Sequence, residues 1–558
     1  MTMNLAQILI HKGLVKPEDL DEAAELRKLE NLRLEVALVR LGLLKEDMLL
    51  KIISEEFHIP RVDVTSAEVD AEVIRLLPRK LVYRKNLLPL SRENGKLRIA
   101  TNDPFDLYAF DEVRLLTGLE VAPVLAGEED IRKVIRAHYG VGGDTIDEMM
   151  STDDLSVVGD ASEQAENILE MAQEASVIRL VNEIFVEALN ERATDIHIEP
   201  YEKDLVIRYR IDGILQNAAV PPQIRHFQAA IISRIKIMAH LNIAEKRLPQ
   251  DGRININLAG RQVDVRVSVI PMLFGEGIVM RLLNKSSVMY SLPQLGMAQD
   301  TFAVFQGLIT RPHGIILVTG PTGSGKTTTL YAALSAIISS EIKVLTVEDP
   351  VEYHLQGVNQ IQVQEKIGLN FARGLRHILR HDPDVVMIGE IRDVETAEAA
   401  IQAALTGHLV FSTLHTNDAC SAATRLLDMG IEPFLVSSTM EAAMAQRLVR
   451  RICPECAEEY QPDLDLLPPD LKLESGQMLR RGVGCKKCRN TGFYGRTGLF
   501  ELMITTEAIR ERIMDRCSAG DITAAARAGG LKALREDGWD KVRAGITTPD
   551  EVARATKA

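Results

Sequence analysis

Long apolar runs are missing from this 558-residue sequence. No stretch of about 18 apolar residues occurs, so we expect no transmembrane helix. The opening segment, MTMNLAQILIHKG, also lacks the basic start and the clean apolar stretch of a secretory signal peptide. We therefore expect a cytoplasmic protein whose contact with any membrane would be through partners.

The sequence also carries no net positive charge. The chain has 79 acidic and 65 basic residues, which gives a formal charge of −14 at pH 7. Proteins that bind nucleic acids usually carry a basic face, because phosphate neutralisation supplies most of their affinity. The acidic balance argues against nucleic acid as the main substrate, although it allows a local basic patch.

A chain of this length exceeds a single hydrophobic core and predicts three or four domains. The first domain begins with a short repeat whose apolar residues and glycines recur at an offset of 29: Leu5, Ile8, Leu9, Gly13, Leu14 and Val15, then Leu34, Ala37, Leu38, Gly42, Leu43 and Leu44. Apolar residues three and four apart indicate amphipathic helices with glycine C-caps. We interpret residues 1–60 as a helical docking unit, with a helical adaptor that binds no ligand as the alternative.

A small α/β domain and a linker follow. Residues 61–140 mix short strands and helices, including two strands around the turn Glu93-Asn94-Gly95. Residues 141–174 are predicted to be a solvated acidic linker, because residues 144–174 contain ten acids and no Lys or Arg.

Residues 175–290 are predicted to form a second α/β domain with several arginines. The alternation in its strand RYR places Arg208 and Arg210 on one face. Such arginines can stabilise the charge that develops on a phosphoryl group during transfer, often from another domain or subunit. We expect Arg210 and Arg266 to serve in this way; Arg253 and Arg281 are weaker candidates, and an ordinary surface role is the alternative for most of these arginines.

The pattern changes again from Gly314 onward. Apolar strands at 315–319, 344–347, 385–388 and 409–412 alternate with helices. Continuous apolar strands separated by helices indicate a parallel sheet that is covered on both faces. We therefore expect residues 291–558 to form one α/β domain that ends in helices.

The first of these strands leads into a phosphate-binding motif. GPTGSGKT fits the P-loop pattern GxxxxGK[ST], in which glycines let backbone N–H groups point at the phosphates of ATP and the next helix adds its positive end. Lys326 is expected to reach the β- and γ-phosphates, and Thr327 to ligate Mg²⁺. The predicted nucleotide-binding residues are Gly320, Pro321, Thr322, Gly323, Ser324, Gly325, Lys326, Thr327 and Thr328.

Candidate catalytic carboxylates follow the next two strands. Glu348 ends the first, and Gly389-Glu390 end the second. Ligands bind at the carboxyl edge of a parallel sheet, so both carboxylates are expected near the phosphates. Because Gly389 replaces the usual Asp, we assign Glu390 to Mg²⁺ through water and Glu348 to activation of the attacking water. His415, after the last strand, is a candidate sensor of the γ-phosphate, with a purely structural role as the alternative.

Four of the six cysteines form two pairs. CPEC at 453–456 and CKKC at 485–488 are separated by 28 residues. This spacing suits a closed tetrahedral Zn²⁺ site, which is structural because no position remains for a substrate. The predicted ligands are Cys453, Cys456, Cys485 and Cys488. A redox role is the weaker reading, and the two lone cysteines are expected to be small buried residues.

Several segments together resemble a known family. VTGPTGSGKTTTLY, LTVEDPVEY, DPDVVMIGEIRD and TGHLVFSTLHTN occur in this order, as do the Walker A, Asp-box, Walker B and His-box segments of the secretion ATPases of type II secretion and type IV pilus assembly. ATDIHIEP, RYRIDG, QDGRI and TGFYGRTGLFEL agree as well. The resemblance is dense over residues 175–505 and loose over the N-terminus.

The resemblance implies a RecA-like P-loop ATPase domain, preceded by a PAS-like α/β domain and a helical N-terminal domain. It implies a homo-hexameric motor for assembling pilin or pseudopilin fibres, with an inner-membrane platform protein and the cytoplasmic domain of a membrane-anchored assembly protein as partners. It assigns the Asp-box role to Glu348, the Walker B role to Glu390 and arginine supply to Arg210 and Arg266. The zinc element points to the assembly and secretion branch of the family.

The N-terminal repeat resembles the tandem motif that binds cyclic di-GMP in some members of this family. That motif uses Arg-Leu-Gly at each start, whereas Leu5-Ala6 and Leu34-Glu35 stand here. We therefore do not expect cyclic di-GMP to bind, and we favour docking to the membrane partner.

Two other functions are alternatives to the motor. The first is an ATP-dependent nucleic-acid translocase of the same superfamily, which a basic pore-facing loop or strong stimulation by DNA would favour; the acidic balance argues against it. A scaffold that binds ATP without turning it over would lack a catalytic carboxylate, yet Glu348 and Glu390 are both present.

Overall fold

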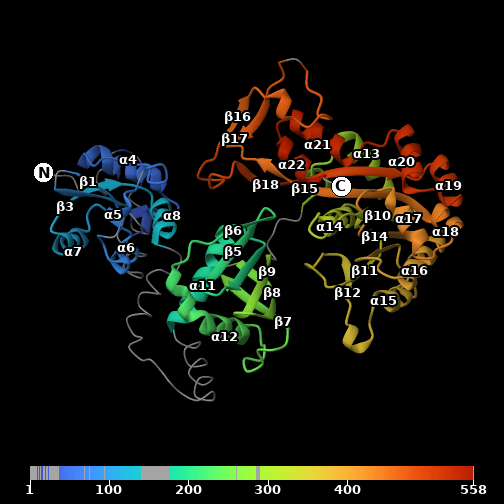
Figure 1. The fold of residues 1–558 in the computed structure, drawn as a ribbon, viewed down its shortest axis with the longest axis horizontal. Coiled ribbons are helices and arrows are strands. Elements are labelled where there is room, and N and C mark those ends of the chain that lie inside the picture. Colours follow the sequence, from blue (N-terminus) through green and yellow to red (C-terminus); the bar gives the residue numbers. More distant parts are fainter. Residues whose placement is uncertain are drawn as a thin grey trace. The chain divides into compact units, whose positions relative to one another are not determined.

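The structure is a computed structural model whose fold is shown in Figure 1. Its internal contacts divide the chain into two compact units. The first unit contains residues 1–258 and 264–282, and the second contains residues 259–263 and 283–558. The structure describes residues 9–10, 12, 14–16, 19–20, 23, 37–39, 41–67, 69–74, 76–93, 95–139, 175–258, 261–284, 290–474 and 476–556. The predicted linker at 141–174 and much of the N-terminal repeat, including Leu5 and Leu34, lie outside the described residues.

The N-terminal part of the first unit is built on a three-stranded sheet. Its elements are α4 (Glu46–Phe57), α5 (Ala71–Ile74), α6 (Arg79–Lys85), β1 (Leu88–Glu93), β2 (Lys96–Thr101), α7 (Leu107–Thr117), β3 (Glu120–Leu125) and α8 (Glu128–Tyr139). β1 and β2 are antiparallel, as their turn at Gly95 suggests, and β3 adds in parallel beside β2. Leu97 and Ile99 on β2 are fully buried and centre the core between the sheet and its helices.

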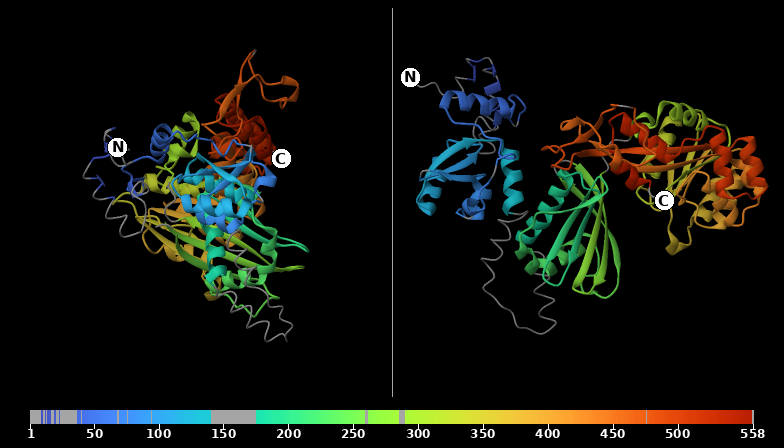
Figure 2. Two further views of the ribbon diagram at one scale, coloured as in Figure 1. Left: turned by 90° about the vertical axis from the view of Figure 1, so that its left-hand side faces the viewer. Right: turned by 45° about the horizontal axis from the view of Figure 1, so that its top comes forward.

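The second part of this unit carries the arginines. Its elements are α11 (Ala175–Asn190), β4 (Asp195–Pro200), β5 (Leu205–Ile211), β6 (Ile214–Asn217), α12 (Gln228–Met238), β7 (Gln250–Leu258), β8 (Arg261–Met272) and β9 (Gly275–Asn284). The strands form one sheet in the order β6-β5-β4-β9-β8-β7. Helices α11 and α12 cover one face of it (Figure 2). Helix α11 buries a stripe with helical spacing, namely Val177, Leu180, Val181, Ile184, Phe185 and Ala188.

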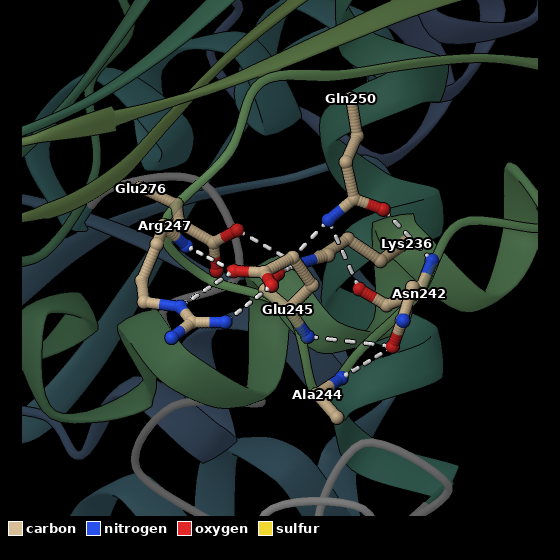
Figure 3. Close-up of polar contacts among 7 residues, drawn as sticks. All are labelled: Lys236, Asn242, Ala244, Glu245, Arg247, Gln250 and Glu276. Carbon is tan, nitrogen blue, oxygen red and sulfur yellow. Dashed lines mark hydrogen bonds and ion pairs between the residues drawn. The ribbon is translucent and has the colours of Figure 1, made fainter.

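A buried ion pair fixes the loop between α12 and β7 (Figure 3). Lys236 is 1% exposed, and its Nζ lies 2.7 Å from Oε1 of Glu276 and 2.7 Å from the carbonyl oxygen of Glu245. Gln250 Nε2 donates to the same carbonyl oxygen at 2.9 Å. Burying an ammonium is costly unless it is paired and hydrogen-bonded, as it is here. These contacts therefore fix the direction in which the loop leads into β7, the strand that carries Arg253.

The second unit contains a seven-stranded sheet in the order β12-β11-β13-β14-β10-β15-β18. Its strands are β10 (Gly314–Thr319), β11 (Val344–Glu348), β12 (Val358–Gln362), β13 (Val385–Ile388), β14 (Leu409–Leu414), β15 (Met440–Ile452) and β18 (Phe493–Ile504). The surrounding helices are α13 (Gln299–Leu308), α14 (Lys326–Ile337), α15 (Phe371–Ile378), α16 (Val394–Leu405), α17 (Ser421–Asp428) and α18 (Pro433–Thr439). All neighbours are parallel except the β15–β18 pair. The predicted α/β fold with a parallel-rich sheet is confirmed.

Each face of this sheet has its own core, because successive side chains of a strand point to opposite faces. Ile315 and Leu317 pack on one face with α15 to α18, while Ile316 and Val318 pack on the other with α13 and α14. Strands buried on both sides must be apolar throughout, which explains the continuous apolar runs in the sequence.

The C-terminal part of the second unit adds a small hairpin and four helices. These are β16 (Ala457–Tyr460), β17 (Leu479–Gly482), α19 (Glu507–Met514), α20 (Ala519–Ala528), α21 (Leu534–Arg543) and α22 (Pro549–Ala555). Among the described residues, no helix is both long and apolar enough to cross a membrane.

Candidate active site

The P-loop occupies the turn between β10 and α14. Gly320, Gly323 and Gly325 have φ values of +147°, +80° and +92°, which residues with a Cβ rarely adopt. A Cβ on Gly320 would lie 2.6 Å from the carbonyl oxygen of Gln446, and one on Gly325 would lie 2.8 Å from Nε2 of the same residue. Both the conformation and the space therefore require glycine, and the loop lies directly against β15.

Lys326, the first residue of α14, reaches back into this loop. Its Nζ donates to the carbonyl oxygens of Gly320 at 2.7 Å and Pro321 at 3.2 Å. Burial lowers the pKa of Lys326, the negative charge of Glu390 opposes this, and Arg447 adds to it. The ammonium, the loop amides and the helix N-terminus together suit a polyphosphate. Thr327 follows on the first turn of α14.

Glu348 ends β11 and is held by three donors. It is 3% exposed. Its Oε1 accepts from Thr346 Oγ1 at 2.5 Å and from Gln360 Nε2 at 3.1 Å, and its Oε2 accepts from the hydroxyl of Tyr331. A buried carboxylate needs such partners, and these fix its orientation.

Glu390 follows β13 and contacts the side chains of His415 and Arg392. His415 Nε2 lies 2.9 Å from Oε2 of Glu390, and Arg392 is hydrogen-bonded to Oε1. Burial alone would raise the pKa of Glu390, but the hydrogen bonds from Arg392 and His415 outweigh it and hold this pKa below its usual value. The structure thus brings Glu390 and His415 together, and the charge of Glu390 acts on Lys326.

Gly389 has a steric reason to be glycine. A Cβ there would lie 3.3 Å from Cε1 of Phe371 and 3.4 Å from Cα of Glu348. An acidic side chain at this position would press against the backbone of β11 where the first candidate carboxylate is attached. The position is therefore tight for any side chain.

Four residues of this site were not among those predicted from the sequence. Arg392 stands two positions after Glu390, so the segment GEIRD contained a signal for it. Tyr331, Gln360 and Arg447 carry no comparable signal, because distant strands and helices bring them in. Arg447 Nη2 donates to the carbonyl oxygen of Asn417, two residues after His415, at 2.9 Å.

The predicted arginines of the first unit gather on one sheet. A cavity of about 430 Å³ is lined by Asp251, Gly252, Arg253, Arg266, Val267, Ser268, Val279 and Arg281. Asp195 contacts one arginine with each of its carboxylate oxygens. Its Oδ1 is 3.0 Å from Arg281 Nε, and its Oδ2 is 3.7 Å from Arg210 Nε. Arg208, in contrast, is paired with Glu199 on the neighbouring strand, with Nη2 2.6 Å from Oε1.

The four paired cysteines form a compact cluster between the ends of β15 and β18. Their Sγ atoms all lie within 4.8 Å of one another. Cys453 and Cys485 are 3.7 Å apart at sulfur, and Cys456 and Cys488 are 3.6 Å apart. Four thiolates at about 2.3 Å from one Zn²⁺ ion would be separated by about 3.8 Å. The donor set and its spacing therefore fit a tetrahedral zinc ion.

Comparison with known proteins places this site in context. Residues 170–554 match the family model described as type II/IV secretion system protein, and residues 57–145 match the MshEN domain. The type IV pilus assembly ATPase PilB of Myxococcus xanthus is 41% identical over 565 residues, covering 100% of this chain and 99% of that protein. The type II secretion system protein E of Xanthomonas campestris is 43% identical over 568 residues, covering 99% and 98%.

A solved structure shares the fold. The X-ray structure of the ATPase DotB from Legionella pneumophila aligns with a TM-score of 0.50 at 22% sequence identity. The alignment covers 67% of this chain and 94% of that one.

Proposed function

Because this chain belongs to the type II/IV secretion system protein family, we propose that it hydrolyses ATP as the motor for assembly of pilin or pseudopilin fibres, in type II secretion or type IV pilus extension. The observation that carries the proposal is the P-loop at the β10–α14 turn, with Glu348, Glu390 and His415 at the ends of the adjoining strands. Two carboxylates and a histidine at the edge of the sheet that carries the P-loop support a phosphate-binding and hydrolytic role.

Each residue has a role in the proposed reaction. The loop amides and Lys326 bind and orient the β- and γ-phosphates, and Thr327 would ligate Mg²⁺, which supplies charge neutralisation when bound. Glu348 accepts a proton from water while the water oxygen bonds to the γ-phosphorus and the bond from that phosphorus to the ADP oxygen breaks. Glu390, oriented by His415 and Arg392, would help to hold Mg²⁺ through water.

The remaining positive charge is proposed to come from the arginine-bearing sheet of a neighbouring subunit. Arg210 and Arg266 would complete the site in a homo-hexamer. Arg266 lines the arginine-rich cavity of that sheet, which supports its assignment, whereas Arg210 lies outside this lining and faces Asp195. The hexamer would work at the cytoplasmic face of the inner membrane, docked to a platform protein and to the cytoplasmic domain of a membrane-anchored assembly protein. Neither nucleic acid nor cyclic di-GMP is part of the proposal.

The cysteine cluster is proposed to hold one structural Zn²⁺ ion. Its four thiolates would close the coordination sphere and tie the end of β15 to the start of β18. Cys453 directly follows β15, the strand that lies against the P-loop, so the cluster would stabilise that strand from its far end.

The proposal is tested by the turnover of Glu348→Gln. We expect kcat to fall about 100-fold, because the amide cannot take the proton from water. ATPase activity is measured over a range of protein concentrations, and wild-type activity should rise as the oligomer forms. Glu341→Gln is the matched control, because Glu341 is exposed near the opposite end of the same strand. Wild-type turnover in Glu348→Gln would exclude Glu348 as the base, and failure of the wild-type protein to hydrolyse ATP would contradict the motor function.

A further inference from the structure

The hydrogen bonds of Glu348 differ between its two carboxylate oxygens. Oε1 accepts from two fixed donors, Thr346 on the same strand and Gln360 on β12. Oε2 accepts from one donor, the hydroxyl of Tyr331 on α14. An ionised carboxylate offers about four lone-pair sites, two on each oxygen. Among the contacts of the described residues, the remaining site therefore lies on Oε2, beside the Tyr331 hydroxyl.

We propose that Tyr331 is a positioning residue that aims Oε2 of Glu348 at the attacking water. This inference rests on the proposed role of Glu348 as the base. Tyr331 touches neither substrate nor metal in this scheme and acts through the carboxylate. Its hydroxyl also accepts from Gln360 Nε2 at 3.3 Å and from the backbone N–H of Glu352 at 3.4 Å. Its hydroxyl takes one lone pair of Oε2, which leaves the other lone pair of that atom to receive the proton from water.

The surroundings of Tyr331 make it a rigid donor. Its side chain is 1% exposed, and its ring packs edge-on against Tyr353 with 4.6 Å between ring centroids. Burial and the charge of Glu348 raise the pKa of Tyr331 well above its usual value, so the hydroxyl keeps its proton and remains a donor.

The position of Tyr331 also links the base to the phosphate site. Tyr331 lies five residues after Lys326 on the same helix, which begins at the P-loop. A helix transmits a displacement of its first turn to the next turn, because consecutive turns share backbone hydrogen bonds. Any movement of α14 that accompanies phosphate binding would therefore change the direction of Oε2.

The test compares two neighbouring tyrosines. Tyr331→Phe removes the hydroxyl and keeps the ring, whereas Tyr353→Phe alters the ring that packs against it without removing a donor to Glu348. We expect kcat of assembled Tyr331→Phe to fall about tenfold with an unchanged KM for ATP, since the loss of one hydrogen bond to a charged group is of this size. Tyr353→Phe should retain wild-type kcat. Binding of a fluorescent ADP analogue verifies that both variants are folded.

A double variant shows whether Tyr331 acts through Glu348 or lowers activity independently of it. If Tyr331 acts through Glu348, then Tyr331→Phe added to Glu348→Gln should cause no further loss in single-turnover hydrolysis. Losses that multiply would overturn the inference, as would equal kcat values for Tyr331→Phe and Tyr353→Phe. Failure of the base assignment is seen separately, as wild-type turnover in Glu348→Gln alone.

Discussion

At the scale of single residues, the site depends on the space that one glycine leaves and on the contacts of one carboxylate. Gly389 leaves space for Phe371 and for the backbone at Glu348, so that β11 and β13 can lie side by side up to their ends. The next residue, Glu390, then carries the acidic group and meets His415 across the sheet edge. Packing between β11 and β13 thus explains why Gly389 stands where an acidic residue is usual.

Replacing this glycine should be costly. Gly389→Asp is expected to lower stability by about 1–3 kcal/mol, because its Cβ would crowd the ring of Phe371 and the backbone of Glu348, and to reduce ATPase activity by displacing Glu348. Thermal unfolding and steady-state turnover measure the two effects. Gly307→Asp serves as the control, since that exposed glycine on α13 has no atom within 4 Å of an added Cβ. Equal stability of the two variants would show that the space at Gly389 is not limiting.

At the scale of elements, the last helix is tied to the strand behind the P-loop. Glu551 on α22 is 2% exposed, and its Oε1 accepts from Arg450 Nη2 at 2.8 Å, while Arg554 Nη2 donates to its Oε2 at 2.8 Å. Burial opposes ionisation of this carboxyl, but the hydrogen bonds from Arg450 and Arg554 prevail and lower its pKa to about 2. The contact therefore stabilises β15 only while Glu551 is ionised.

This helix contact predicts a specific pH dependence. Because the pKa of Glu551 is depressed on folding from 4.5 to about 2, its contribution of about 3 kcal/mol is present above pH ~4.5 and is lost as the pH falls toward 2. Glu551→Gln should lower the unfolding midpoint at neutral pH and flatten this acid limb, as followed by thermal melts between pH 7 and pH 3. Glu507→Gln, an exposed glutamate on α19, is the control. An unaltered acid limb in Glu551→Gln would disprove the linkage.

At the scale of the whole molecule, contacts between distant segments assemble the working parts. The cysteine pairs are 28 residues apart in sequence, yet β15 and β18 bring their sulfur atoms within 4.8 Å. The arginines of the first unit come from different strands and meet on one sheet. Each cluster exists only when its sheet is formed.

Zinc content tests the first of these clusters. Wild-type protein purified under reducing conditions without chelator should contain about one Zn²⁺ per chain by elemental analysis. Cys453→Ser should lose the ion and melt at a lower temperature, because the link between β15 and β18 is broken. Cys517→Ser should keep the ion, since that cysteine stands outside the cluster. Metal-free wild-type protein would rule out the zinc assignment.

The P-loop, the parallel sheet and the family of this protein could be predicted from its sequence alone. The P-loop could be recognised because its chemistry needs consecutive residues, and GPTGSGKT supplies them between a buried strand and a helix. The parallel sheet was predictable for a similar reason, since burial on both faces demands continuous apolar strands. The motifs also identified the family to which the comparisons assign the chain.

The tertiary structure alone decided the rest. Tyr331 and Gln360 reach Glu348 from a helix and a strand that no local pattern connects, and Arg447 meets the segment after His415 by way of β15. The spacing of apolar residues in the sequence predicts which face of a helix is buried, because residues three or four positions apart lie on the same face. It does not encode which donor meets which acceptor, because such a pair forms only after separate elements pack at fixed distances.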